Sequence, residues 1–156
     1  MAPRATTTLP FYAAGMMPPS LEDVRTLLEA PSPAVLTTYR KDGSALTTPV
    51  WFRWTGPAFE VVIARGDVKL RHLERDRRCV LVIFESVAPF RGVEVRGEAS
   101  LQDRDVSAIR RSIAERYLGE SAGERFAAQR ASKPGVLLEL SQEQPRVWNL
   151  AGMLSP

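Results

Sequence analysis

The chain has 156 residues, of which 44% are hydrophobic and 25% charged, as in an ordinary globular protein that can bury a core. Its single cysteine excludes an internal disulfide, its single histidine removes most histidine-based metal sites, and its net charge of +3 is only a weak indication of an anionic partner. The longest apolar run, residues 79–84, is far shorter than the roughly 20 residues of a spanning helix, so no membrane association is predicted. An enzyme of this composition is expected to take its chemistry from an organic cofactor.

The two ends of the chain are predicted to lie outside the folded unit. Residues 1–19 are rich in threonine and proline, which predicts a loose leader, and the prolines and Gly15 interrupt its apolar stretch too often for a signal peptide. The lone Cys79 fits a reducing cytoplasm. We expect one domain over residues 20–150 and a tail over residues 151–156.

Short strand patterns alternate with a few helical ones along residues 20–150. Helices are predicted from Ser20 to the prolines at 31 and 33, from Asp67 to Leu73, from Asp103 to Gly119 and from Ser121 to Arg130. Strands are predicted over residues 34–39, 45–54, 59–64, 79–84, 93–101 and 136–140. Asp42-Gly43 is the hairpin signal between the first two strands, and residues 79–84, apolar at every position, predict a strand buried on both faces.

This order of elements indicates a mainly β fold of the α+β class. Antiparallel strands dominate and helices are inserted at the joins, so we expect a small β-barrel rather than a doubly wound sheet. The sequence has no GxGxxG or P-loop motif and no HExxH, and only His72 is present to activate a serine. These absences argue against the common nucleotide-binding and hydrolase sites.

The strand over residues 47–54 carries large aromatic side chains on both faces. Alternation places Phe52 and Trp54 on one face and Trp51 on the other, so one face forms core and the other covers a ligand, a partner chain or a packed helix. Pro49 favours an edge strand. The hydroxyls of Thr47 and Thr48 are able to bond a heterocycle or a phosphate.

A possible anion site follows at residues 64–73. A strand end, Gly66 and a helix start leave backbone N–H groups free to meet an anion, and Arg65, Lys69 and Arg71 add positive charge there. An amphipathic surface helix with solvated charges explains the same pattern equally well, and an Asp67 cap would compete with a phosphate. Both interpretations stay open on the residues alone.

Taken in order, these segments resemble the split β-barrel flavin- and deazaflavin-binding family, the pyridoxamine 5′-phosphate oxidase-like proteins. The segments that carry the resemblance are Ala34 to Thr38, Lys41-Asp42-Gly43, Thr48 to Phe52, Lys69 to Arg78 and Val93 to Gly97, within a match from about Pro33 to Trp148. The resemblance implies a homodimer that binds its cofactor in clefts at the subunit interface.

The resemblance also implies roles for particular residues. The ring and upper chain of the cofactor would lie against Thr47, Thr48, Pro49, Val50 and Trp51, with Ile63, Ala64 and Arg65 beside it. Lys69 and Arg71 would hold the phosphate, and Trp148 would come from the opposite subunit. No catalytic residue or proton donor is assigned.

One departure from the family points to a particular branch. Pyridoxamine phosphate oxidases carry an Arg and a Lys around the strand that here spans residues 47–52, and neither position is basic. The chain looks more like the branch that uses the deazaflavin coenzyme F420, which implies an oxidoreductase delivering hydride to a small, unsaturated organic substrate.

Three other functions remain in competition. The first keeps the fold and replaces F420 by FMN, and the second is a carrier of flavin, heme or another tetrapyrrole without turnover. The third is a basic barrel that binds single-stranded nucleic acid through Trp51, Phe52 and Trp54. These aromatics alternate between two faces instead of forming one exposed stripe, so we do not expect a nucleic-acid partner.

Overall fold

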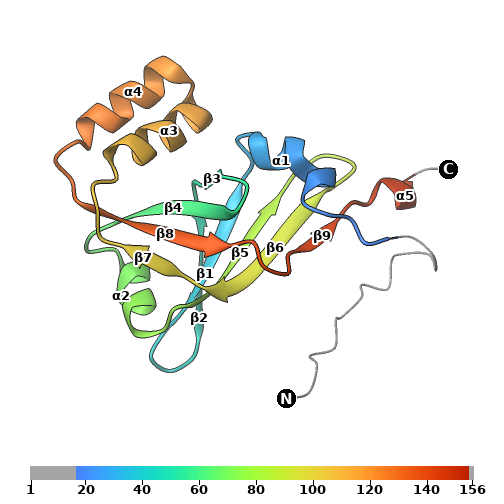
Figure 1. Ribbon diagram of the computed structural model, residues 1–156, viewed down its shortest axis with the longest axis horizontal. Helices are drawn as coiled ribbons and strands as arrows, with labels where there is room; N and C mark the ends of the chain where they lie inside the picture. The colour runs from blue at the N-terminus through green and yellow to red at the C-terminus, as the bar shows by residue number, and fades with distance from the viewer. Residues whose placement is uncertain (1–16, 155–156) are drawn as a thin grey trace.

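The computed structural model describes residues 17–154 and consists of two antiparallel sheets with helices at their edges (Figure 1). The predicted leader lies outside the described residues as far as residue 16, and so do the last two residues of the predicted tail. The predicted α+β class, dominated by antiparallel strands, is confirmed.

Each sheet combines strands that are distant in the sequence. The five-stranded sheet contains, in spatial order, β2 (Ala45–Val50), β1 (Ala34–Tyr39), β5 (Arg78–Phe84), β6 (Gly92–Glu98) and β9 (Arg146–Trp148). The four-stranded sheet contains β3 (Arg53–Trp54), β4 (Ala58–Ala64), β8 (Gly135–Ser141) and β7 (Ser100–Gln102). The helical segments are η1 (Glu22–Val24), α1 (Arg25–Glu29), α2 (Val68–Arg75), α3 (Ser107–Leu118), α4 (Glu120–Gln129) and α5 (Ala151–Leu154).

The core lies between the inner faces of the two sheets. Leu36, Leu81 and Val95 face one another across β1, β5 and β6 and are fully buried. Val61 and Leu138, paired across β4 and β8, belong to the same cluster from the other sheet. Alternation along each strand therefore directs one set of side chains into a shared interior.

The outer face of the five-stranded sheet is less covered than the sequence suggests. In β5 the side chains of Val80, Val82 and Phe84 are half-buried, whereas Cys79, which lies on the inner face, is buried. The expectation that residues 79–84 are buried on both faces is therefore wrong for this single chain. Burial raises the pKa of the Cys79 thiol to about 12, as expected of an inert core cysteine.

Two predicted strands are each divided into two. The segment over residues 45–54 ends as β2 at Val50 and resumes as β3 at Arg53, and the segment over residues 93–101 breaks at Ala99 between β6 and β7. At both breaks the chain passes from one sheet to the other, which one continuous strand is unable to do. Pro49 lies in β2, which ends the sheet and pairs only with β1, so the predicted edge position is confirmed.

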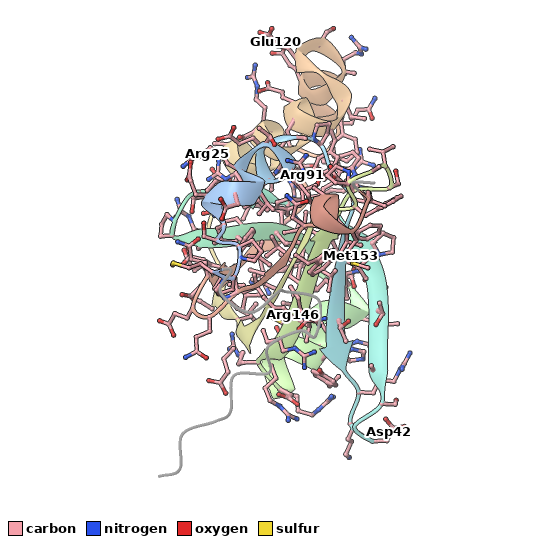
Figure 2. All side chains as sticks on the ribbon, turned by 90° about the vertical axis from the view of Figure 1, so that its right-hand side faces the viewer. Arg25, Asp42, Arg91, Glu120, Arg146 and Met153 are labelled. Atoms are coloured by element: carbon pink, nitrogen blue, oxygen red, sulfur yellow. The ribbon has the colours of Figure 1, made fainter. Side chains whose placement is uncertain are left out.

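The helices α3 and α4 form a hairpin at one end of the molecule. Figure 2 shows Glu120 on this hairpin at one extremity and Asp42, in the β1–β2 turn, at the other. Gly119 joins the helices with a φ of 82°, and its N–H caps α3 by donating to the Glu115 carbonyl. A Cβ atom at Gly123 would lie 2.4 Å from the Glu115 backbone, so only glycine allows the two helices this close.

The first helical segment is shorter than predicted. It consists of the 3₁₀ turn η1 followed by five residues of α1. The Asp23 carboxylate accepts hydrogen bonds from the Ser20 N–H at 2.7 Å and from its hydroxyl at 2.9 Å, which is half of a capping box. Among residues 17–154, no helix combines the length and the apolar character needed to cross a bilayer.

Candidate functional site

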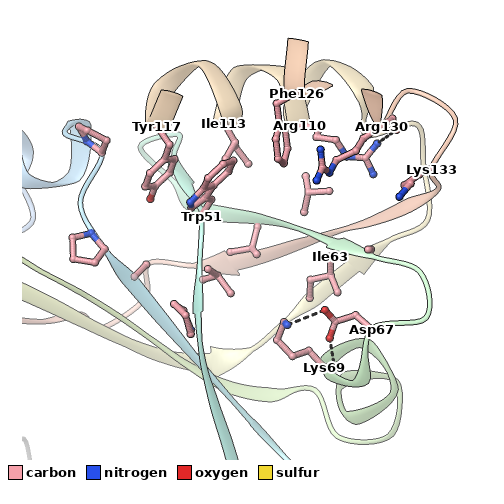
Figure 3. A pocket seen from close by; sticks show the side chains of 18 residues that line it. Trp51, Ile63, Asp67, Lys69, Arg110, Ile113, Tyr117, Phe126, Arg130 and Lys133 are labelled. Carbon is pink, nitrogen blue, oxygen red and sulfur yellow. Dashed lines mark hydrogen bonds and ion pairs between the residues drawn. The ribbon is translucent and has the colours of Figure 1, made fainter. Parts of the chain in front are cut away.

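A cleft of about 830 Å³ opens between the two sheets and the α3–α4 hairpin (Figure 3). Its floor comes from the ends of β2 and β4, its lower rim from the start of α2, and its upper wall from the hairpin. The two strand ends and the helix start belong to the strand over residues 47–54 and to the segment over residues 64–73, which the sequence singled out separately. The fold brings them to one place.

An aromatic wall forms one side of the cleft. The Trp51 and Tyr117 rings stack with centroids 5.1 Å apart and an interplanar angle of 7°. Phe126, on α4, tilts against Trp51 at the same centroid distance of 5.1 Å. These rings offer a flat, apolar surface to a ligand, because Trp51 and Phe126 are only half-buried.

Buried hydrogen bonds hold the aromatic wall in place. The Tyr117 hydroxyl donates to the Ser32 carbonyl at 2.9 Å and accepts from the Phe52 N–H at 3.4 Å. Arg116 donates to the carbonyls of Phe52 at 2.7 Å and of Leu28 at 2.5 Å, and also to Ala30. Helix α3 is therefore tied to α1, to the segment that follows it and to the β2–β3 join.

Lys69 lies at the lower rim with a carboxylate partner. Asp67 caps α2 by accepting from the Lys69 N–H at 2.8 Å, and the same carboxyl group bonds Lys69 Nζ at 2.9 Å. Burial acts to raise the pKa of Asp67, but the hydrogen bonds and charge of Lys69 outweigh it and lower that pKa. The predicted cap is thus confirmed, and an incoming phosphate has to share Lys69 with Asp67.

A second set of cations lines the hairpin side of the cleft. Arg110, Arg130 and Lys133 all face the cavity, on the side away from Tyr117 (Figure 3). Arg110 is buried although it is an arginine, and its Nη1 donates to the Arg130 carbonyl at 2.8 Å. The cleft therefore combines an aromatic end and a cationic end.

Six of the predicted site residues line this cleft: Pro49, Val50, Trp51, Ile63, Ala64 and Lys69. The contribution of α3 and α4 was missed, namely Arg110, Ile113, Tyr117, Phe126, Arg130 and Lys133. The sequence placed Ile113 and Tyr117 on one helical face, but a core-packing face shows the same pattern as a ligand-binding face. Nothing in the pattern indicated which sheet that face would cover.

The other predicted site residues lie away from the cleft. The Thr47 hydroxyl bonds that of Thr37 at 3.0 Å on the outer face of the sheet, and Arg65 forms an ion pair with Asp103. Arg71 is exposed on α2.

Thr48 and Trp148 lie in the two opposite edge strands of the five-stranded sheet, β2 and β9. Thr48 pairs with Leu36, and its buried Oγ1 has no hydrogen-bond partner among residues 17–154. Trp148 lies across Gly92 on the neighbouring strand, where a Cβ atom would meet its ring at 2.0 Å. Their predicted roles toward a cofactor stay predictions.

The residues of the cleft fit a flat, phosphorylated ring. Aromatic and aliphatic side chains supply planar surfaces, and Lys69 and the hairpin cations supply charge for a phosphate. Within the described part of the chain, no group of three or more histidine, cysteine or acidic residues is arranged to hold a metal ion.

Comparisons with known proteins agree on the fold. The family model described as pyridoxamine 5′-phosphate oxidase matches residues 20–149. A conserved hypothetical protein from Mycobacterium tuberculosis has a similar structure, with a TM-score of 0.76, 19% identity and 92% of each chain covered. No curated protein sequence matches the chain.

Two further solved structures have a similar fold. An F420 reductase matches with a TM-score of 0.63 and 21% identity, over 78% of this chain and 94% of its own. A FAD-binding protein from Mesorhizobium loti matches with a TM-score of 0.58 and 18% identity, over 82% of this chain and 91% of its own. At these identities the likeness establishes the fold.

Proposed function

The chain belongs to the pyridoxamine 5′-phosphate oxidase family, and on this premise we propose that it is a homodimeric oxidoreductase using the deazaflavin coenzyme F420. In this proposal the cofactor binds in the cleft described above and transfers hydride to a small, unsaturated organic substrate. The F420 reductase of similar fold supports the choice of cofactor.

One observation carries the proposal. Three separate segments, the β2 end with Trp51, the β4 end with Ile63 and the α2 start with Lys69, meet in one cleft of about 830 Å³. That volume is within the range of small-molecule sites, and the mixture of apolar surface and a few cations suits a ring that carries a phosphate. A cleft used only for packing would not require a lysine at its rim.

The protein's part in such a reaction is binding and orientation. The cofactor, when bound, supplies hydride chemistry, so the chain needs no acid–base dyad of its own for that step. Trp51 and Phe126 would cover the ring and exclude water, and Lys69 would hold the phosphate. A phosphate near Lys69 Nζ would replace part of its bond to Asp67.

The outer face of the five-stranded sheet supports a homodimer. Val35 pairs in register with Val82, and Val80 and Phe84 extend this half-buried apolar surface along β5. Apolar side chains left half-covered in the centre of a sheet favour association with another surface. In a dimer formed through this face, the two copies of β1 and β5 would pack against each other.

The cofactor is tested by titrating the purified apo-protein with F420 and with FMN and following fluorescence. We expect F420 to bind more tightly, and Lys69→Ala to weaken its binding by about 1.5–3 kcal/mol, the size of a lost charge-assisted bond. Lys41→Ala, in the distant β1–β2 turn, is the matched control and should leave binding unchanged. Tight FMN binding without F420 binding would identify FMN as the cofactor in place of F420.

The dimer is tested by measuring mass in solution with light scattering. Wild-type protein should have twice the chain mass, and Val82→Lys, which places a charge in the apolar face, should give the monomer. Val87→Lys is the control, because Val87 is 64% exposed in the loop after β5. A wild-type monomer would refute the homodimer.

A further inference from the structure

We propose that the α3–α4 hairpin forms a second anion-binding subsite, built by Arg110, Arg130 and Lys133 across the cleft from Lys69. The subsite would bind a carboxylate or phosphate group attached to a flat ligand. This inference rests on the proposed function only in treating the cleft as a ligand site, and it does not depend on the identity of the cofactor.

Arg110 is the strongest evidence for this subsite. Only 9% of the residue is exposed, and it nevertheless lines the cleft. Among residues 17–154, its guanidinium group hydrogen-bonds the Arg130 carbonyl alone, and no acidic side chain there forms an ion pair with it. Burying a guanidinium group without a counterion is costly, so such a group usually has an anionic partner.

The position of the Arg110 side chain is closely restricted. Its Nη2 lies 2.9 Å from where a Cβ atom would stand on Gly135, the first residue of β8. Val106, at the start of α3, lies against the same point at 2.9 Å. The absence of a side chain at Gly135 therefore leaves the space that the guanidinium group occupies beside the cleft.

Arg130 and Lys133 add charge at the mouth of the same wall. The Arg130 guanidinium carbon lies 3.7 Å from the centroid of the Phe126 ring, which holds it beside the aromatic wall. The Lys133 N–H donates to the Arg130 carbonyl at 2.9 Å, so the turn after α4 brings both side chains to one place. Neither forms an ion pair with a described acidic residue.

The nearby carboxylates already have partners. Asp67 is bonded to Lys69, and Asp103 is paired with Arg65. The Asp105 carboxylate accepts from the Ser107 hydroxyl at 2.6 Å and from its N–H at 2.9 Å, and these bonds, more than Arg110, lower its pKa. The positive charge on the hairpin is therefore available to a ligand.

The geometry also restricts the class of ligand. Phe126 belongs both to the aromatic wall with Trp51 and to the contact with Arg130. A molecule that places a planar ring on this wall would direct an attached acidic group toward the cations. That group comes either from the acidic tail of the cofactor or from a carboxylate on the substrate, which are two sources of the same chemistry.

The test uses the full-length protein and the variants Arg130→Gln and Lys133→Gln, singly and together. Arg125→Gln is the control, since Arg125 is exposed on α4 and its side chain, within residues 17–154, hydrogen-bonds Ser121 alone. The cofactor probes are F420 and its deazaflavin core without phosphate and glutamates. The substrate probes are 2-naphthoate and the uncharged 2-naphthamide, followed by tryptophan fluorescence and NMR.

If the subsite holds the cofactor tail, the double variant should weaken F420 binding by about tenfold or more and leave binding of the core unchanged. If it holds a substrate acid, the double variant should instead remove the preference for naphthoate over naphthamide. Either result supports the subsite, and Arg125→Gln should change neither.

The inference is overturned if the double variant changes neither F420 binding nor the naphthoate preference. Failure of the proposed function is recognised separately, as wild-type protein that binds neither F420 nor FMN. In that case a naphthoate preference that the double variant removes still supports the subsite. Circular dichroism spectra confirm that every variant is folded.

Discussion

Trp51 and Tyr117 are 66 residues apart in the sequence and stack almost parallel, at 7° and with centroids 5.1 Å apart. One follows the edge strand β2, and the other lies in the last turn of α3. The stack joins the five-stranded sheet to the helical hairpin. The width of the cleft therefore depends on where α3 is held, not only on the strands that form its floor.

Two substitutions of Tyr117 distinguish the contribution of its hydroxyl group to stability from that of its ring. We expect Tyr117→Phe to lower the free energy of unfolding by about 1 kcal/mol, because the Ser32 carbonyl loses its donor while the ring stack remains. Tyr117→Leu should cost about 1 kcal/mol more through loss of the aromatic pair. Urea denaturation measures both. Equal stability of the two variants would show that the stack contributes nothing.

Arg116 should matter more for stability than its half-exposed position suggests. Arg116→Met should lower the free energy of unfolding by about 3 kcal/mol, because backbone carbonyls of Leu28, Ala30 and Phe52 lose a charged donor. Arg116→Lys should recover only part of this lost stability, since an ammonium group lacks the planar fork that reaches several acceptors.

The control for this prediction lies on the same helix. Arg111 is exposed and forms surface ion pairs with Glu115 one turn away and with Glu124 on α4, so Arg111→Met should change stability by less than about 0.5 kcal/mol. The two variants are compared by urea denaturation at the same pH. A loss at Arg116 no larger than that at Arg111 would contradict the role of the buried carbonyl contacts.

Local signals predicted most of the elements. The Asp42-Gly43 turn, the Asp67 cap and the Gly119 stop each depend on one or two residues, and the structure has all three. Strand breaks at residues 51–52 and at Ala99 were missed, because they arise where the chain changes sheets. That event depends on how distant strands pair, which local alternation does not contain.

Some residues of the candidate site were likewise predicted from the sequence, and others were missed. Trp51 was predicted from a strand with aromatics on both faces, Lys69 from a charged helix start, and Ile63 from the family resemblance; all three line the cleft. Arg110 and Arg130 were missed, since an arginine on a helix is usually a solvated surface charge. Only the packing of the hairpin over the cleft, with Gly123 against Glu115, makes them part of it.

Gly123 should therefore be sensitive to the smallest substitution. Gly123→Ala adds one methyl group 2.4 Å from backbone atoms of Glu115, so α4 has to move away from α3. We expect a loss of about 1–3 kcal/mol in the free energy of unfolding, the usual cost of overpacking, although alanine favours helix. Gly152→Ala, where a Cβ atom meets open space, is the control. Equal stability of the two variants would contradict the close helix contact.

His72 should make stability depend on pH in a defined window. Its Nδ1 lies 3.0 Å from the hydroxyl of the buried Thr38, and its pKa in the folded protein is below the ordinary value of 6.5. Burial, which disfavours the charged imidazolium, is the largest cause; Arg75, Arg40 and Arg71 act in the same direction, and Asp67 opposes them.

Because the unfolded chain binds this proton more readily, the free energy of unfolding should fall as pH decreases through 6.5 and level off below the folded pKa of His72. His72→Gln keeps a side chain able to bond Thr38 but does not titrate, so its stability should stay nearly constant between pH 7.5 and pH 5.5. The pKa values of the Asp67 and Glu85 carboxyl groups are lowered from their ordinary values of 3.8 and 4.5, so these two groups titrate below this window. Urea denaturation at several pH values measures both proteins, and a wild-type slope that persists in His72→Gln would assign the effect to another group.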